Sequence, residues 1–181
     1  MAIDIIQEVK NRLGNTSVPK IDPNTQEPIK EEQASHDVAS ATIPVVLFGF
    51  YKNTRNEHDA NKLMEKSNEG SLKRLFREHT EDIINAVSNY SSTSADDARN
   101  TMEKTVAVVK DIVEQSIKSM NGTAIVNFFT DQRTNILKHL PAELHAGELI
   151  NDPAMDDRTN KMEGPMSGMM HIIEKIFSST K

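Results

Sequence analysis

The chain has 181 residues, a length typical of one domain, and 36% of them are hydrophobic while 27% are charged. It contains no cysteine, which excludes disulfide frameworks, cysteine-based zinc sites and thiol nucleophiles. Lys and Arg total 21 against 27 Asp and Glu, and this net charge of −6 disfavours binding to nucleic acid, which is a dense polyanion. The longest apolar stretch, residues 39–51, is shorter than the ~20 residues that span a bilayer. We therefore predict a soluble, cytoplasmic protein with no membrane span.

Apolar residues recur at spacings of three and four along most of the chain, and no segment shows two-residue alternation. This pattern predicts an all-α fold, a bundle of about seven or eight helices. The first predicted helix covers residues 2–13 and ends at Gly14. Three prolines within residues 15–30 prevent a helix there. We therefore predict that residues 1–30 form an N-terminal helix and a proline-rich linker. Together they would be an arm attached to the helical domain 31–181.

Two predicted helices follow the linker, over residues 31–51 and 54–66. Pro44 should kink the first of them or split it in two, because proline removes a helix hydrogen bond. A further helical segment is predicted to begin at Leu72 and to restart at Thr80.

The clearest predicted helix starts after Ser94, a favourable N-cap that is followed by Asp96 and Asp97 in the first turn. Its apolar stripe is predicted to continue to Met120, and Gly122 is expected to end it.

Thr123 is expected to cap the next helix, which runs to Leu140. A short helix is predicted over 141–149, and the last one begins at Pro165.

Residues 31–66 and 95–140 share one pattern when the sequence is shifted by 64 residues: an acidic start, a long apolar helix, a polar turn and a shorter helix. In this alignment Val45 lies over Val109. A repeated unit that cannot bury its apolar face alone packs against its neighbour, so we predict two packed helix–turn–helix repeats. The alternative is two ordinary amphipathic helix pairs.

Two runs carry a family resemblance: residues 43–50, Ile-Pro-Val-Val-Leu-Phe-Gly-Phe, and residues 58–64, His-Asp-Ala-Asn-Lys-Leu-Met. Together they resemble the bacterial YidB-like proteins of unknown function, over about residues 31–140. The resemblance implies an all-helical repeat and a bacterial source, and it implies no activity and no catalytic residue. Asp59 stands where those proteins carry a glycine, and the Gly/Leu-rich stretches common in them are missing.

The sequence contains no glycine-rich phosphate loop, no H-E-x-x-H motif and no Glu-x-x-His pair of the di-iron type. One candidate metal site remains, made of His139, His145, Glu148 and Asp152. His145 and Glu148 share a helix face if 141–149 is helical, and imidazole with carboxylate suits zinc. The alternative is an ordinary polar helix end, and we predict no bound cofactor.

Met166, Met169 and Met170 lie on one side of the last predicted helix and have two interpretations. Methionine packs ordinary cores, and it also lines adaptable surfaces for a protein partner or for self-association. The basic run 73–77 is followed at once by acidic residues, which favours a solvated helix face over a nucleic-acid site.

The missing catalytic motifs favour a non-enzymatic protein that works as a protein–protein interaction or scaffold module, with a partner protein or with itself. An alternative from a different class is a small-molecule or metal-binding protein with a site between helices. In that alternative a hydrolytic activity would be centred on His139, His145 and Glu148.

Overall fold

The computed structural model describes residues 3–14, 18, 38–65 and 70–141. Within them, seven α-helices and one short 3₁₀ helix follow one another, and these residues form no strand. The predicted all-α class is confirmed. The two helices predicted beyond Pro141 lie outside the described residues.

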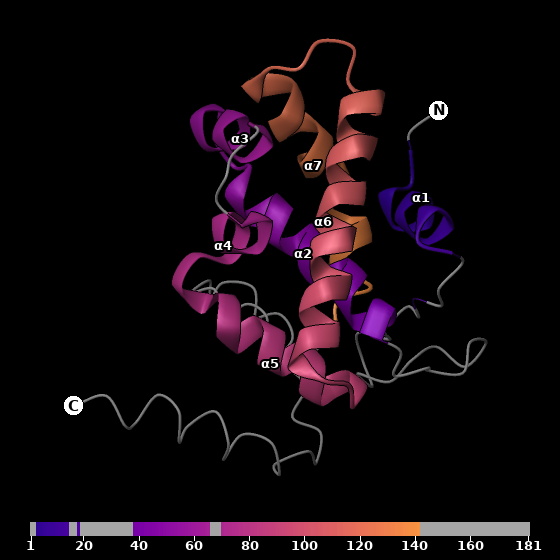
Figure 1. Ribbon diagram of the computed structural model, residues 1–181. Coiled ribbons are helices and arrows are strands. Elements are labelled where there is room, and N and C mark those ends of the chain that lie inside the picture. The colour runs from indigo at the N-terminus through magenta and orange to yellow at the C-terminus, as the bar shows by residue number, and fades with distance from the viewer. Residues whose placement is uncertain (1–2, 15–17, 19–37, 66–69, 142–181) are drawn as a thin grey trace, which may run out of the picture.

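The elements are, in chain order, α1 (Ile5–Arg12), α2 (Val38–Asn53), α3 (Glu57–Met64), α4 (Ser71–Phe76), η1 (Arg77–His79), α5 (Thr80–Ser91), α6 (Ala95–Ser116) and α7 (Gly122–Leu137). Figure 1 shows α6 crossing in front of α2, with α3, α4 and α5 on one side of it and α1 on the other. α2 packs against every other α-helix of the described chain, and its most extensive contacts are with α6 and α7. None of the described helices is long and apolar enough to cross a membrane.

The central helix α2 is buried at every position from Ala39 to Phe50. Its sequence is apolar nearly all round, and such a helix has to be enclosed by other elements. Pro44 was expected either to kink this helix or to split it in two. α2 continues through Pro44, so the split does not occur. Proline removes one backbone hydrogen bond, and the helices that enclose α2 hold the turns on either side of it.

Side-chain caps mark the starts of α1, α3, α6 and α7. Ser94 caps α6 as predicted, since its hydroxyl accepts a hydrogen bond from Asp97 N at 3.0 Å. The predicted start of α7 is wrong: Asn121, not Thr123, is the N-cap, and its side chain accepts from Ala124 N at 2.9 Å. Asparagine is a stronger N-cap residue than threonine, and it takes the position two residues earlier.

The predicted end of α6 is also corrected. The helix ends at Ser116, and Ile117 already has an extended backbone. Met120 therefore lies in the connection between α6 and α7 instead of on the apolar stripe, and 42% of its surface is exposed. Gly122 is the first residue of α7 and does not end α6.

The described parts of residues 31–66 and 95–140 form two helix–turn–helix units, α2–α3 and α6–α7. α2 packs on α6 and α7, and α3 packs on α7, so the two units pack against each other as predicted. Asn56 and Asn121 serve as N-caps of the second helix in the two units. That the two units are an internal repeat, and not two ordinary amphipathic helix pairs, stays a prediction.

The starts of α3 and α7 approach each other so closely that only glycine fits at position 122. A Cβ added to Gly122 would lie 2.5 Å from the carbonyl oxygen of Glu57, which is backbone and cannot move aside. We expect Gly122→Ala to lower the free energy of unfolding by about 1–3 kcal/mol, measured by urea denaturation. Gly70→Ala is the matched control, because its Cβ would meet only a Glu103 carboxylate oxygen at 4.0 Å. Equal stability of the two variants would contradict this close packing.

Candidate functional site

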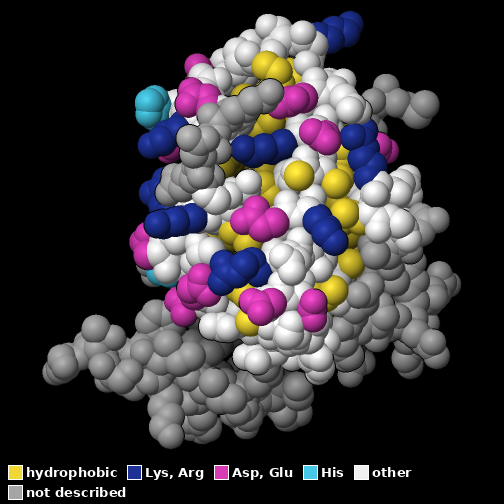
Figure 2. All heavy atoms as spheres, viewed as in Figure 1, with side chains coloured by type: hydrophobic (Ala, Val, Ile, Leu, Met, Phe, Trp, Pro, Cys, Tyr) yellow, Lys and Arg dark blue, Asp and Glu magenta, His cyan; other side chains and the backbone are white. Residues whose placement is uncertain are grey.

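A groove lies where the end of α3, the end of α6 and the start of α7 meet. It is shallow and open to solvent, has a volume of about 570 Å³, and is lined by Asn61, Met64, Glu65, Glu114, Met120 and Ile125. Figure 2 shows apolar side chains at the surface of this face, among charged side chains of both signs.

The local structure explains why these side chains converge. Met64 is the last residue of α3, and Glu114 lies in the last turn of α6. Ile125 lies in the first turn of α7 and is buried. Because α6 ends at Ser116, the connection to α7 carries Met120 over the groove.

The groove combines an apolar floor with an acidic rim. Ile125 is buried, Met64 is half-buried, and Met120 is the one large hydrophobic side chain that is exposed in the described part of the chain. The side chains of Glu65 and Glu114 line the same opening, and both residues are exposed. Flexible thioethers adapt to different apolar shapes, and carboxylates at a rim favour cationic neighbours.

Arg74 of α4 contacts the end of α3 beside the groove, and Lys110 of α6 lies close enough to Arg74 and Glu114 to feel their charges. Arg74 donates a hydrogen bond of 2.6 Å to the carbonyl oxygen of Glu65, the residue that ends α3. Burial lowers the pKa of Lys110, and the nearby charge of Arg74 lowers it further, while Glu114 acts in the opposite direction. Arg74, which belongs to the basic run 73–77, thus has a structural role at the end of α3.

The candidate metal site falls mostly outside the described residues. Of its four members only His139 is described. His139 lies two residues after the end of α7 and is 6% exposed. The Nδ1 atom of His139 donates to the carbonyl oxygen of Asn135 at 2.8 Å, since a carbonyl can only accept. His145, Glu148 and Asp152 lie outside the described residues, as do Met166, Met169 and Met170.

Within residues 3–14, 18, 38–65 and 70–141, no group of three or more potential metal-ligating side chains comes together. The metal site therefore stays a prediction. The described part of the chain contains one of its four residues, the buried His139.

The N-terminal helix α1 is held by side chains of α7. Gln132 is buried; its Oε1 accepts from Ile5 N at 3.3 Å and its Nε2 donates to the carbonyl of Ile3 at 2.8 Å. Asn135 Nδ2 donates to the carboxylate of Asp4 at 2.6 Å. The apolar side of α1 joins the core through three buried residues, Ile5, Ile6 and Val9. The predicted N-terminal arm is thus docked along its helix.

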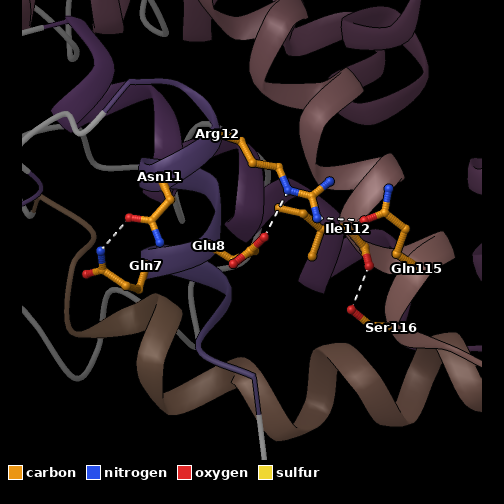
Figure 3. Close-up of polar contacts among 7 residues, drawn as sticks. All are labelled: Gln7, Glu8, Asn11, Arg12, Ile112, Gln115 and Ser116. Atoms are coloured by element: carbon orange, nitrogen blue, oxygen red, sulfur yellow. Dashed lines mark hydrogen bonds and ion pairs between the residues drawn. The ribbon is translucent and has the colours of Figure 1, made fainter.

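The other end of α1 reaches the last turn of α6. Arg12 Nε lies 2.9 Å from a carboxylate oxygen of Glu8, and Arg12 donates a second hydrogen bond of 2.7 Å to Gln115 Oε1 (Figure 3). Gln115 is the neighbour of Glu114, which lines the groove. The last turn of α6 therefore contacts α1 on one side and the groove on another.

Comparison with known proteins finds no family model, no curated protein and no solved structure that matches this chain. The resemblance to YidB-like proteins stays a prediction.

Sequence reasoning missed the groove because it placed Met120 on the buried stripe of α6. The pair Asn121–Gly122 was the available signal: a strong N-cap residue directly after Met120 places that methionine outside both helices. Gln132 gave a weaker signal, as a polar residue at helical spacing between the apolar residues Phe129 and Ile136.

The Gln132 contacts predict a test of how α1 is held. Gln132→Leu keeps the apolar wall but leaves the Ile5 N–H and the Ile3 carbonyl without their partner, which costs about 1–3 kcal/mol. We expect a lower free energy of unfolding in urea and faster hydrogen exchange of the α1 amides. Gln115→Leu, which removes only the exposed contact with Arg12, should change stability by less than about 0.5 kcal/mol. Similar losses in both variants would show that the buried amide is not what holds α1.

The charge of Asp4 predicts a pH dependence. Burial raises the pKa of Asp4, but hydrogen bonds from Gln7 N and Asn135 and the charges of His139 and Lys138 outweigh it, so the pKa is lower than usual. A lowered folded-state pKa adds stability above the ordinary carboxyl pKa of about 3.9, and that stability is lost as the pH falls through the folded-state value.

We therefore expect Asp4→Asn to be less stable than the wild type at pH 7, by less than about 1 kcal/mol because Asp4 is exposed and water screens its charge. The difference should vanish as the pH falls below the folded-state pKa, in urea unfolding measured across the acid range. Asp111→Asn, an exposed carboxylate on α6, is the control. A difference that stays constant or grows in acid would contradict the role of the Asp4 charge.

Proposed function

We propose that this chain is a protein–protein interaction module, and that its groove receives an amphipathic helix of another protein. The observation that carries the proposal is the exposed Met120 side chain in a groove that is also lined by the apolar residues Met64 and Ile125 and by the acidic residues Glu65 and Glu114. The occupant we infer presents apolar side chains at helical spacing with Lys or Arg beside them. This is a mode of recognition in which a helix lays its apolar face into a groove.

The shape of the groove favours a protein segment over a small molecule. Small-molecule sites of a similar volume, about 300–1,000 Å³, bury most of the ligand's surface. This groove is shallow and open at the surface, so it would leave a small molecule largely in water. Side chains that project from a helix can enter it while the helix itself stays outside.

The charge of the chain supports a basic partner. The net charge is −6, and Glu65 and Glu114 place negative charge at the opening itself. Complementary charges accelerate association and exclude partners of the wrong sign more than they add to affinity. We propose that the protein acts in the bacterial cytoplasm, by binding a partner and without catalysing a reaction. The resemblance to YidB-like proteins supports the bacterial source.

The small-molecule or metal alternative keeps its predicted residues, His139, His145, Glu148 and Asp152. Within the described residues, His139 belongs to no group of three or more potential metal ligands. The protein-binding proposal is therefore the one that the described contacts support.

The proposal is tested with synthetic helical peptides of about 15 residues, near the length at which isolated helices begin to form. One peptide carries an apolar face flanked by lysines, and the other carries the same apolar face flanked by glutamates. We expect only the lysine peptide to bind in calorimetric titrations. Met120→Glu and Glu114→Lys should each weaken this binding by about tenfold or more, equivalent to about 1.4 kcal/mol.

Two control variants separate the groove from general effects. Asp111→Lys makes the same change of net charge as Glu114→Lys, one turn earlier on α6 and outside the groove lining. Ala107→Glu adds a carboxylate at an exposed position of the same helix. Both should bind the lysine peptide nearly as the wild type does. Equal binding of both peptides, or equal losses in Asp111→Lys and Glu114→Lys, would rule out the groove as the docking site.

A further inference from the structure

We propose that Met120 is an oxidation site, at which a peroxide converts the thioether to a sulfoxide and thereby makes the groove polar. The site is defined by the described structure. Its effect on binding rests on the function proposed above.

The methionines of the described chain differ sharply in access. Met120 is 42% exposed, Met64 is half-buried in the same groove, and Met102 on α6 is 0% exposed in the core. The sequence has no cysteine, so no thiol of this chain competes for the oxidant. Met120 is therefore accessible to a small peroxide in the folded protein, whereas Met102 is reached only when the core opens.

The reaction is a transfer of one oxygen atom. A lone pair of the Met120 sulfur attacks the peroxide oxygen, the O–O bond breaks, and a proton moves to the departing oxygen. The sulfur is oxidised by two electrons to the sulfoxide, and hydrogen peroxide is reduced to water. Methionine sulfoxide reductases reverse this step, one enzyme for each sulfoxide epimer, so the change can act as a switch.

The position of Met120 lets oxidation change the groove without unfolding the chain. It lies in the connection between α6 and α7, outside both helices. Met120 lines the groove together with the apolar residues Met64 and Ile125 and the acidic residues Glu65 and Glu114. A sulfoxide oxygen is a strong hydrogen-bond acceptor, so it disfavours an apolar face in the groove and adds to the negative potential of the rim.

The experiment treats the full chain with dilute hydrogen peroxide and follows each methionine by peptide mass mapping. We expect Met120 to gain one oxygen at least about tenfold faster than Met102, with Met64 between them, while the helical circular dichroism stays unchanged. Incubation with methionine sulfoxide reductases should then restore the original mass. Oxidation of Met102 as fast as Met120 in the folded protein would overturn the proposal.

The effect on the groove is read with the lysine-flanked peptide. Peroxide treatment should weaken its binding by about tenfold or more in the wild type, and the reductases should restore binding. Met120→Leu has no sulfur at this position, so peroxide treatment should leave the affinity that the untreated Met120→Leu variant shows unchanged, whatever that affinity is. Equal losses in the wild type and Met120→Leu would overturn the switch. Selective oxidation of Met120 in a protein that binds no peptide would support the oxidation site and reject only the function proposed for the groove.

Discussion

The enclosure of α2 is the constraint on which the rest of the structure depends. Its residues from Ala39 to Phe50 are all buried, so no face of this helix is left for solvent. α4 comes so close that a Cβ on Gly49 would lie 2.7 Å from the ring of Phe76, and Asn53 Nδ2 donates to the carbonyl of Leu75 at 2.8 Å. α7 covers another side, where Phe50 and Phe129 stack with ring centroids 5.4 Å apart. The surrounding helices are placed by the need to cover α2.

The groove follows from how the two helix–turn–helix units meet around this central helix. The starts of α3 and α7 touch through Glu57 and Gly122, and the Thr123 hydroxyl lies 2.7 Å from a carboxylate oxygen of Glu57. This contact brings the rest of α3 alongside α7. α6 ends at Ser116 and leaves a short connection to span the distance to Asn121. The ends of α3 and α6 therefore meet the start of α7 at the groove, where Met120 is exposed.

The sequence was a good guide to the fold class and to the start of α6. The all-α class and the cap of α6 at Ser94 both depend on residues close together in the chain. The predicted end of α6 was wrong because Gly122 and Thr123 were assigned by their usual preferences for helix ends and helix caps. Asn121 is a better cap than Thr123, and glycine is required at position 122 by the close approach of Glu57. The Gln132 contact joins residues 127 positions apart, so no local pattern indicates it. The groove likewise exists only where three separate helices converge.

The last turn of α6 links the docking of α1 to the groove. Neighbouring residues on an α-helix point about 100° apart, so Gln115 can contact Arg12 of α1 while Glu114 lines the groove. The exposed polar contact with Arg12 contributes little energy by itself. The buried residues Ile5 and Val9 anchor α1 against the core, and they therefore supply most of the energy that sets its position beside α6. α1 contributes no residue to the lining of the groove. It nevertheless helps to fix the last turn of α6, which carries Glu114 of the acidic rim.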